Sequence, residues 1–395
     1  MNLNKKLKKK SDYFDKFDED GETKRKLSGS NLKLVGFIAV SWTLFQLWYA
    51  SPLPFIFNFG QFIDVPARAI HLAFAMSLCF LLYPSLKSKR NQGIQVIDYI
   101  LVVLGLVATL YLVFQYEGLV HRQGIMANIS ILGFAIPYEV ILGTVGIALL
   151  LEATRRVIGL PLVIIALIFI IFSIFGKVMP DLVAHAGLSI NRLIGYHWLG
   201  GEAIFGIPIS VSVSFIFLFV LFGSILDAAG GGKYFLNLAF AMVGRMRGGP
   251  AKAAILASGL TGMISGSSVA NTVTTGTFTI PIMKKTGLSA VKAGAIEVAS
   301  SVNGQLMPPI MGAAAFIMAE LLGISYFEVV KHAFLPAVIS YIALFYISHL
   351  ESLKLGIKGL PENEIPPLKR TFIDGIHYLI PIVVLVYLLL VENWT

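Results

Sequence analysis

The sequence predicts an all-α, polytopic membrane protein, and three observations lead to this fold class. The 395 residues are 56% hydrophobic and only 13% charged, and their mean hydropathy is +0.79, whereas soluble domains carry about 25% charged residues. Apolar runs recur along the chain with basic residues gathered between them, which is the pattern that orients membrane spans. Two apolar stretches in the second half are interrupted by polar residues, Gly or Pro, which is typical of broken membrane helices.

Charge, cysteine content and motifs exclude several classes of function. The net charge is +9, and the basic residues that produce it lie between the apolar runs. Basic residues in such loops set the topology of membrane spans, so we expect a lipid bilayer and no nucleic acid as partner. The single cysteine, Cys79, excludes an intrachain disulfide or a cysteine metal cluster. Because no HExxH, P-loop or nucleophile-elbow motif is present, we expect neither an enzyme nor a protein that binds ATP, and no organic cofactor.

Residues 1–30 are expected to form a charged, solvated arm on the cytoplasmic side. Five lysines precede residue 11, an acidic patch covers residues 12–22, and Lys24, Arg25 and Lys26 follow. This composition lacks the apolar periodicity that a segment needs to fold alone. The apolar run that follows has no good cleavage site, so we expect an uncleaved anchor.

Residues 31–156 are expected to form a four-span unit. Its apolar runs cover residues 32–50, 68–83, 94–115 and 136–151. Basic clusters at residues 87–90 and at Arg155 and Arg156 alternate with uncharged loops, so the unit begins and ends in the cytoplasm.

The second region, residues 157–395, begins with spans at residues 157–178 and 204–226. Between them, residues 180–202 contain Trp198 and are expected to lie at the external membrane interface. The glycine run that starts at Gly230 ends the second of these spans, because successive glycines leave the backbone flexible. A short amphipathic arm at residues 234–246 follows.

Residues 250–285 are expected to form a re-entrant helical hairpin. Two apolar arms, residues 253–264 and 273–283, flank a polar centre at residues 265–272. Each arm reaches roughly 20 Å as a helix, which is too short for a hydrocarbon core of about 30 Å. Lys252 precedes the hairpin and Lys284 and Lys285 end it, so both ends are expected on the cytoplasmic side.

A broken helix is expected next. A helix starting at residue 289 cannot run through Pro308 and Pro309, because proline has no N–H and clashes with the preceding turn. An apolar helix resumes at residues 312–322, so the polar break at residues 300–305 lies near the bilayer centre. Two further spans are expected at residues 327–348 and 371–391.

The two interruptions are candidate binding elements. Exposed N–H groups at half-helix ends suit a carboxylate, and hydroxyl, amide and carbonyl oxygens suit Na⁺ as the only metal. The candidate residues are Ser265, Gly266, Ser267, Ser268, Asn271 and Thr272 at the hairpin tip, and Ser300, Ser301, Asn303 and Gly304 on the broken helix. The alternative is that these small residues only allow close helix packing.

Glu297 precedes this second cluster by one helical turn. It either biases the cavity toward a cation or pairs, in the cytoplasmic half of the helix, with Lys292 or another basic residue, since unpaired charges are rare within membranes. The pairing is the expectation that we adopt.

Residues 259–287, with their SGSS…N…T core, and the segment NGQLMPPIMG at residues 303–312 resemble the large membrane subunit of tripartite ATP-independent periplasmic (TRAP) transporters. The four-span unit lies where fused permeases of this family carry their small subunit, an arrangement of four plus twelve spans that is typical of the TAXI branch. The resemblance implies a Na⁺-coupled importer of small organic anions, mostly carboxylates, delivered by a separate periplasmic receptor. It also implies an elevator-type inverted-repeat fold in the inner membrane of a bacterium or archaeon, with a cytoplasmic N-terminus.

The resemblance is incomplete in one respect. Large subunits of this family contain two inverted repeats, each with a hairpin and a broken helix, whereas residues 157–395 show one of each. We therefore expect the N-terminal part of a longer permease, whose missing C-terminal repeat completes the site. Two alternatives are a divalent-anion/Na⁺ symporter, whose Ser-Asn-Thr tip is partly matched by Asn271 and Thr272, and a non-transporting membrane scaffold fragment.

Overall fold

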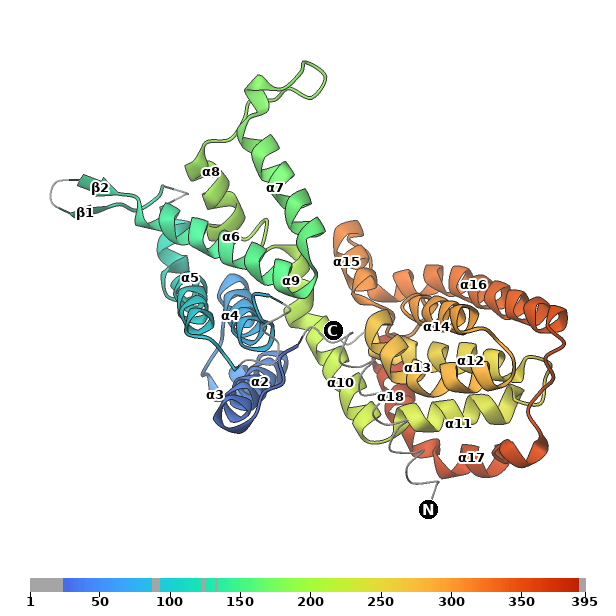
Figure 1. The fold of residues 1–395 in the computed structure, drawn as a ribbon. Coiled ribbons are helices and arrows are strands. Elements are labelled where there is room, and N and C mark those ends of the chain that lie inside the picture. Colours follow the sequence, from blue (N-terminus) through green and yellow to red (C-terminus); the bar gives the residue numbers. More distant parts are fainter. Residues whose placement is uncertain (1–23, 87–92, 123–124, 132–133, 391–395) are drawn as a thin grey trace. The chain divides into compact units, whose positions relative to one another are not determined.

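The computed structural model describes residues 24–86, 93–122, 125–131 and 134–390, so most of the expected N-terminal arm lies outside the described residues. Helices dominate the described chain, as predicted, and a short hairpin of β1 (Ile129–Ile131) and β2 (Phe134–Ile136) pairs Ile129 with Ile136. The chain divides into two compact units, residues 1–213 and 214–395 (Figure 1). Five described helices are long and apolar enough to cross a membrane: Gly29–Ala50, Asp64–Leu82, Val96–His121, Ile207–Ala228 and Tyr326–Lys354.

The first unit is a helical bundle. Its main helices are α2 (Gly29–Ala50), α3 (Leu53–Phe57), α4 (Asp64–Leu82), α5 (Val96–His121), α6 (Tyr138–Val157), α7 (Leu160–Ile174), α8 (Ile190–Ile194) and α9 (Ile207–Val211). A buried ion-pair cluster closes one end, where Asp98 bonds Arg25 at 2.6 Å and Arg156 at 2.7 Å. Arg25 is therefore packed rather than solvated, whereas its neighbours Lys24 and Lys26 are exposed.

Trp198 corrects one expectation about this unit. Rather than lying at a membrane interface, its side chain is fully buried in the core, and its Nε1 donates to the Ala108 carbonyl at 3.1 Å. The ring lies against Gly146 on α6, where an added Cβ would come within 2.2 Å of it. A glycine on the neighbouring helix thus makes room for the indole.

The second unit contains the predicted hairpin and broken helix. Its helices are α10 (Phe217–Ala228), α11 (Gly231–Val243), α12 (Gly249–Ser265), α13 (Ser268–Lys285), α14 (Ala290–Gly304), α15 (Ala313–Leu322), α16 (Tyr326–Lys354), α17 (Leu368–Asp374) and α18 (Leu379–Leu390). Helix α12 packs against α11, α13, α14 and α16, so the first arm of the hairpin lies at the centre of this unit.

The hairpin tip is shorter than predicted. Only Gly266 and Ser267 separate the two arms, and α13 begins at Ser268, so Asn271 and Thr272 are helical. Gly266 has φ +61°, a left-handed conformation that glycine adopts without strain. Ser267 caps α13, because its Oγ accepts from the Ala270 N–H at 3.3 Å.

The helix break also lies later than predicted. Ser300, Ser301 and Asn303 belong to α14, and the break covers residues 305–312, including Pro308 and Pro309. Serine is tolerated inside the helix, where its hydroxyl bonds to the carbonyl four residues earlier, as the Ser300 Oγ does to the Ile296 carbonyl at 2.6 Å. The prolines, and not the polar residues, therefore end the helix.

The last expected span, residues 371–391, is not one straight helix. Helices α17 and α18 belong to segments bent by 59° relative to each other, and the described chain ends at residue 390. Gly375 lies at the bend against the Tyr234 ring, which an added Cβ would approach to 2.0 Å. Glycine at the bend thus allows a close contact with α11.

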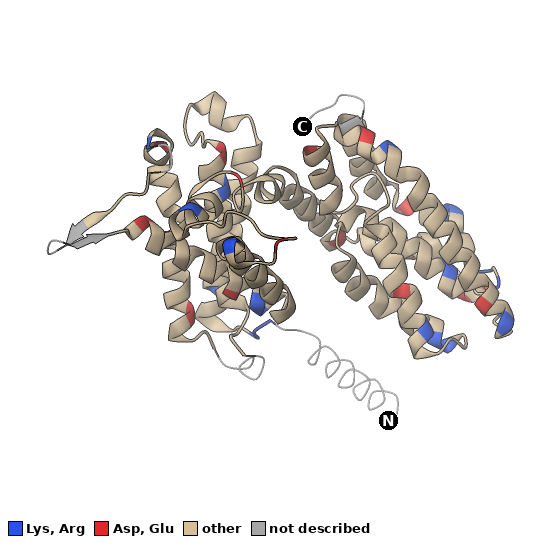
Figure 2. Cartoon of the chain, turned by 90° about the horizontal axis from the view of Figure 1, so that it is seen from above, with Lys and Arg blue, Asp and Glu red and all other residues tan. Residues whose placement is uncertain are grey.

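Most Lys and Arg residues of the second unit lie toward one end of its helices, whereas its Asp and Glu residues are spread along them (Figure 2). Lys292 near the start of α14 bonds Glu351 near the end of α16, and Lys252 in the first turn of α12 contacts His349 on α16. The start of α12 and the start of α14 therefore lie on the same side as the end of α16.

Candidate functional site

Asn271 is the centre of a buried polar network that joins α12, α13 and α14. Its Nδ2 donates to the Ser258 carbonyl at 2.8 Å and lies 2.9 Å from the Ser258 Oγ and 3.3 Å from the Ser301 Oγ. Its Oδ1 accepts from the Thr261 Oγ1 at 2.5 Å. Asn271 and Ser301, predicted from separate motifs, are therefore neighbours.

Glu297 extends this network toward the other end of α13. Its carboxylate is fully buried and accepts from the Thr279 Oγ1 at 2.5 Å, from the Thr275 Oγ1, and from the Ser301 Oγ at 3.5 Å. The expected pair with Lys292 is wrong. Residues five apart lie on different faces of a helix, and Lys292 bonds Glu351 instead.

No cationic side chain forms an ion pair with Glu297 within the described part of the chain. Burying a carboxylate is costly unless hydrogen bonds or a cation compensate for the lost hydration. Three hydroxyl groups supply that compensation here.

Glycines bring the hairpin and the broken helix into backbone contact. A Cβ added to Gly304 would lie 2.8 Å from the Gly262 Cα, and one added to Gly262 would lie 2.8 Å from the Gly304 Cα. Gly304 therefore serves close packing of α12 against α14, a role that small residues commonly have in membrane helices.

The hairpin tip is tied to the helix break. The Gln305 Nε2 donates to the Gly266 carbonyl at 3.1 Å, and the Gln305 carbonyl accepts from the Gly312 N–H at 2.8 Å. At the far end of the break, the Pro309 carbonyl accepts from the Tyr326 hydroxyl at 3.0 Å. The structure thus places the two predicted interruptions side by side.

A cavity of about 380 Å³ opens beside the hairpin tip. Of the predicted residues, Ser265, Ser267 and Asn271 line it, whereas Ser268, Thr272 and residues 300–304 do not. Its other polar lining residues come from α10, α12 and α13: Ser224, Asp227, Thr261 and Thr274. The described lining contains one carboxylate, that of Asp227, and no Lys or Arg. The described residues contain no cluster of three His, Cys, Asp or Glu that could hold a metal ion.

Several network residues were not predicted. Ser258 and Thr261 contact the predicted residues across helices, so nothing local marks them. Gln305 lies in the predicted polar break but was not assigned to the site. Thr275 and Thr279 follow Asn271 at intervals of four residues, and this spacing places all three on one face of a helix. That periodicity is a signal from which the polar face of α13 could have been found.

Two short helices that meet a broken helix at a shared polar centre define a class of membrane transport protein. The family profile described as tripartite ATP-independent periplasmic transporter, DctM component, matches residues 145–395. Because this match covers more than half of the chain, the chain belongs to this family, which favours the TRAP interpretation over a divalent-anion/Na⁺ symporter.

Known relatives agree with this assignment. The chain is 32% identical over 193 residues, 49% of its own length and 41% of the relative's, to the uncharacterized protein YgiK of Salmonella typhimurium. It is 35% identical to the C4-dicarboxylate TRAP transporter large permease protein DctM of Rhodobacter capsulatus, over 23% of the chain and 21% of that protein. It is 30% identical to the isethionate TRAP transporter permease protein DctMQ of Oleidesulfovibrio alaskensis, over 36% of the chain and 22% of that protein.

The chain thus spans less than half the length of these curated relatives. The relatives with functional names are permeases, so the family transports solutes rather than catalysing reactions. Together with the membrane-length helices, the family places the chain among multi-pass inner-membrane proteins.

Proposed function

We propose that this chain is the permease component of a Na⁺-coupled secondary transporter that imports carboxylates delivered by a periplasmic receptor. In this proposal it is a TAXI-type fusion, with residues 31–156 as the small-subunit-like domain and residues 157–395 as the first part of the large-subunit-like domain. Its N-terminus is cytoplasmic. A second hairpin from a further repeat faces the first across the cavity.

The lining of the 380 Å³ cavity is the observation that carries this proposal. Hydroxyl, amide and carboxylate oxygens are the ligands that hard cations prefer. Ser267, Asn271 and Asp227 supply such oxygens around one space, and no basic side chain in the described lining competes with a cation. Bound Na⁺ would offset the negative charge of Asp227 and attract the anionic substrate.

The substrate carboxylate has a second source of attraction at the tip. Helix α13 starts at Ser268, so its first N–H groups and the positive end of its dipole lie at the cavity. Substrate binding then depends on Na⁺ because the cavity lining itself supplies no positive side chain.

Uptake in proteoliposomes tests this proposal. The complete permease with its receptor is expected to accumulate labelled C4-dicarboxylate or glutamate when a Na⁺ gradient is imposed. Ser267→Ala and Asn271→Ala should raise the Na⁺ concentration needed for half-maximal uptake, because each removes an oxygen from the cavity, whereas Ser289→Ala at the distant start of α14 should not. The site would be refuted if uptake by the wild type did not depend on Na⁺. It would also be refuted if both cavity variants needed the same Na⁺ concentration for half-maximal uptake as the wild type.

A further inference from the structure

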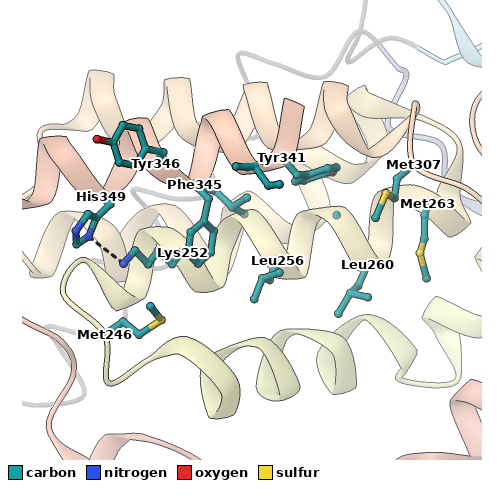
Figure 3. A pocket seen from close by; sticks show the side chains of 13 residues that line it. Met246, Lys252, Leu256, Leu260, Met263, Met307, Tyr341, Phe345, Tyr346 and His349 are labelled. Atoms are coloured by element: carbon teal, nitrogen blue, oxygen red, sulfur yellow. Dashed lines mark hydrogen bonds between the residues drawn. The ribbon is translucent and has the colours of Figure 1, made fainter. Parts of the chain in front are cut away.

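A second and larger cavity lies between α12 and α16. Its volume is about 520 Å³, and none of the predicted site residues lines it. Figure 3 shows Lys252 and His349 at one end and Met263 and Met307 at the other. Between these ends the walls are apolar, with Ile255, Leu256, Leu260, Ile342 and Phe345.

The polar end of this cavity carries a buried positive charge. Lys252 is only 2% exposed, and its Nζ lies 3.1 Å from the His349 Nδ1 and 5.2 Å from the centre of the Phe345 ring. Because an ammonium only donates, the Nδ1 of His349 is the acceptor. No carboxylate forms an ion pair with Lys252 among the described residues.

Charge complementarity therefore favours an anionic occupant. An ammonium removed from water needs a compensating charge or a full set of acceptors, and one imidazole nitrogen and one ring face supply only part of that. Lys252 also lies in the first turn of α12, where the helix dipole adds positive potential.

The length of the cavity indicates which anion fits. From Lys252 to Met263 along α12 the distance is about 16 Å at 1.5 Å per residue, which is about half of a 30 Å hydrocarbon core. The charged end coincides with the side where Lys292 bonds Glu351. On α16 the lining residues Ile342 and Tyr346 are also exposed, so the groove is open to the surface. A charged end and an apolar body of one-leaflet depth match a membrane lipid.

We propose that this groove binds one anionic glycerophospholipid, with its phosphate on the Lys252 ammonium and one acyl chain along α12 and α16. A soluble anion would satisfy the charge but leave the apolar walls unfilled. This lipid site is independent of the transported solute and of the coupling ion.

Lipid binding to the purified full chain tests the proposal. The protein in lipid-free detergent is titrated with palmitoyl-oleoyl phosphatidylglycerol, and bound lipid is counted by native mass spectrometry. The wild type is expected to hold one lipid more tightly than any other. Lys252→Met, which keeps the side-chain length, should weaken that site about fivefold or more, and Lys252→Arg should retain it. Leu260→Trp should abolish it by filling the apolar part.

Two controls separate this site from general effects. Lys285→Met removes an exposed lysine at the end of α13 and should leave the tight site unchanged. Thermal denaturation should show that phosphatidylglycerol raises the melting temperature of the wild type but not of Leu260→Trp. Equal lipid affinity of Lys252→Met and the wild type would overturn the proposal, and so would the absence of a tight lipid on the wild type.

Discussion

Packing between α12 and α14 gives a sharp test of the hairpin geometry, through a single methyl group at Gly304. An alanine Cβ there would lie 2.8 Å from the Gly262 Cα and 3.2 Å from the Ser258 carbonyl oxygen. Carbon atoms are in favourable contact at about 3.5–4.0 Å, so the two helices must separate by roughly 1 Å. Both obstructing groups are backbone, which cannot rotate away. Such overpacking costs about 1–3 kcal/mol.

Gly294 on the same helix is the matched control. An added Cβ at this position meets nothing within 4 Å, so Gly294→Ala should stabilise the protein by about 0.5–1 kcal/mol through reduced backbone entropy of the unfolded chain. The two alanine variants should therefore differ in melting temperature by several degrees, in opposite directions from the wild type. Thermal denaturation of the purified protein in detergent, followed by circular dichroism, measures this difference.

The result that refutes this reasoning is equally clear. If Gly304→Ala melts at or above the temperature of the wild type, α12 and α14 are not in backbone contact. The neighbouring contact of Asn271 with Ser301, which also joins the hairpin to α14, would then be in doubt as well.

Two further predictions concern the buried carboxylate and the topology. Glu297→Leu should lower the melting temperature, because it removes the shared acceptor of three hydroxyl groups and a hydrogen bond to a charged group contributes about 1.5–3 kcal/mol. Glu297→Gln keeps one acceptor oxygen and should have a smaller effect, and Glu320→Gln, on an exposed side chain, should have none. The network would be contradicted if Glu320→Gln lowered the melting temperature and Glu297→Leu left it unchanged. Thr286→Cys, in a Cys79→Ser background, should react with a membrane-impermeant maleimide only from the cytoplasmic side, and labelling from outside would reverse the proposed orientation of the hairpin.

The positions of the hairpin and the break were predictable because glycine and proline act locally. Gly266 adopts a positive φ, and the pair Pro308 and Pro309 follows the end of α14, whereas the single prolines Pro281 and Pro336 lie inside α13 and α16. The helix boundaries were not predictable to the residue. Ser268 to Thr272 read as a polar loop, yet serine and asparagine are also favoured at helix starts, and the Ser267 cap decides in favour of a helix.

Tertiary contacts were the least predictable part. The sequence places Glu297 near Lys292, but the partners of both residues come from other helices. The burial of Trp198 likewise depends on Gly146, which lies 52 residues earlier in the chain and leaves space for the indole. Of the predicted site, Asn271 and Ser301 meet, whereas the Ser300 hydroxyl returns to its own helix.

The bond from Gln305 to the Gly266 carbonyl has a mechanical consequence. One glutamine holds the hairpin tip through its side chain and the far end of the break through its backbone carbonyl. Opening the tip as a gate while the broken helix stays in place would break the Gln305 bond and the contact of Asn271 with Ser301. A movement of the hairpin and the break together would keep these bonds, and the chain turns at the other ends of the hairpin at Gly248 and Gly287, which both have positive φ angles.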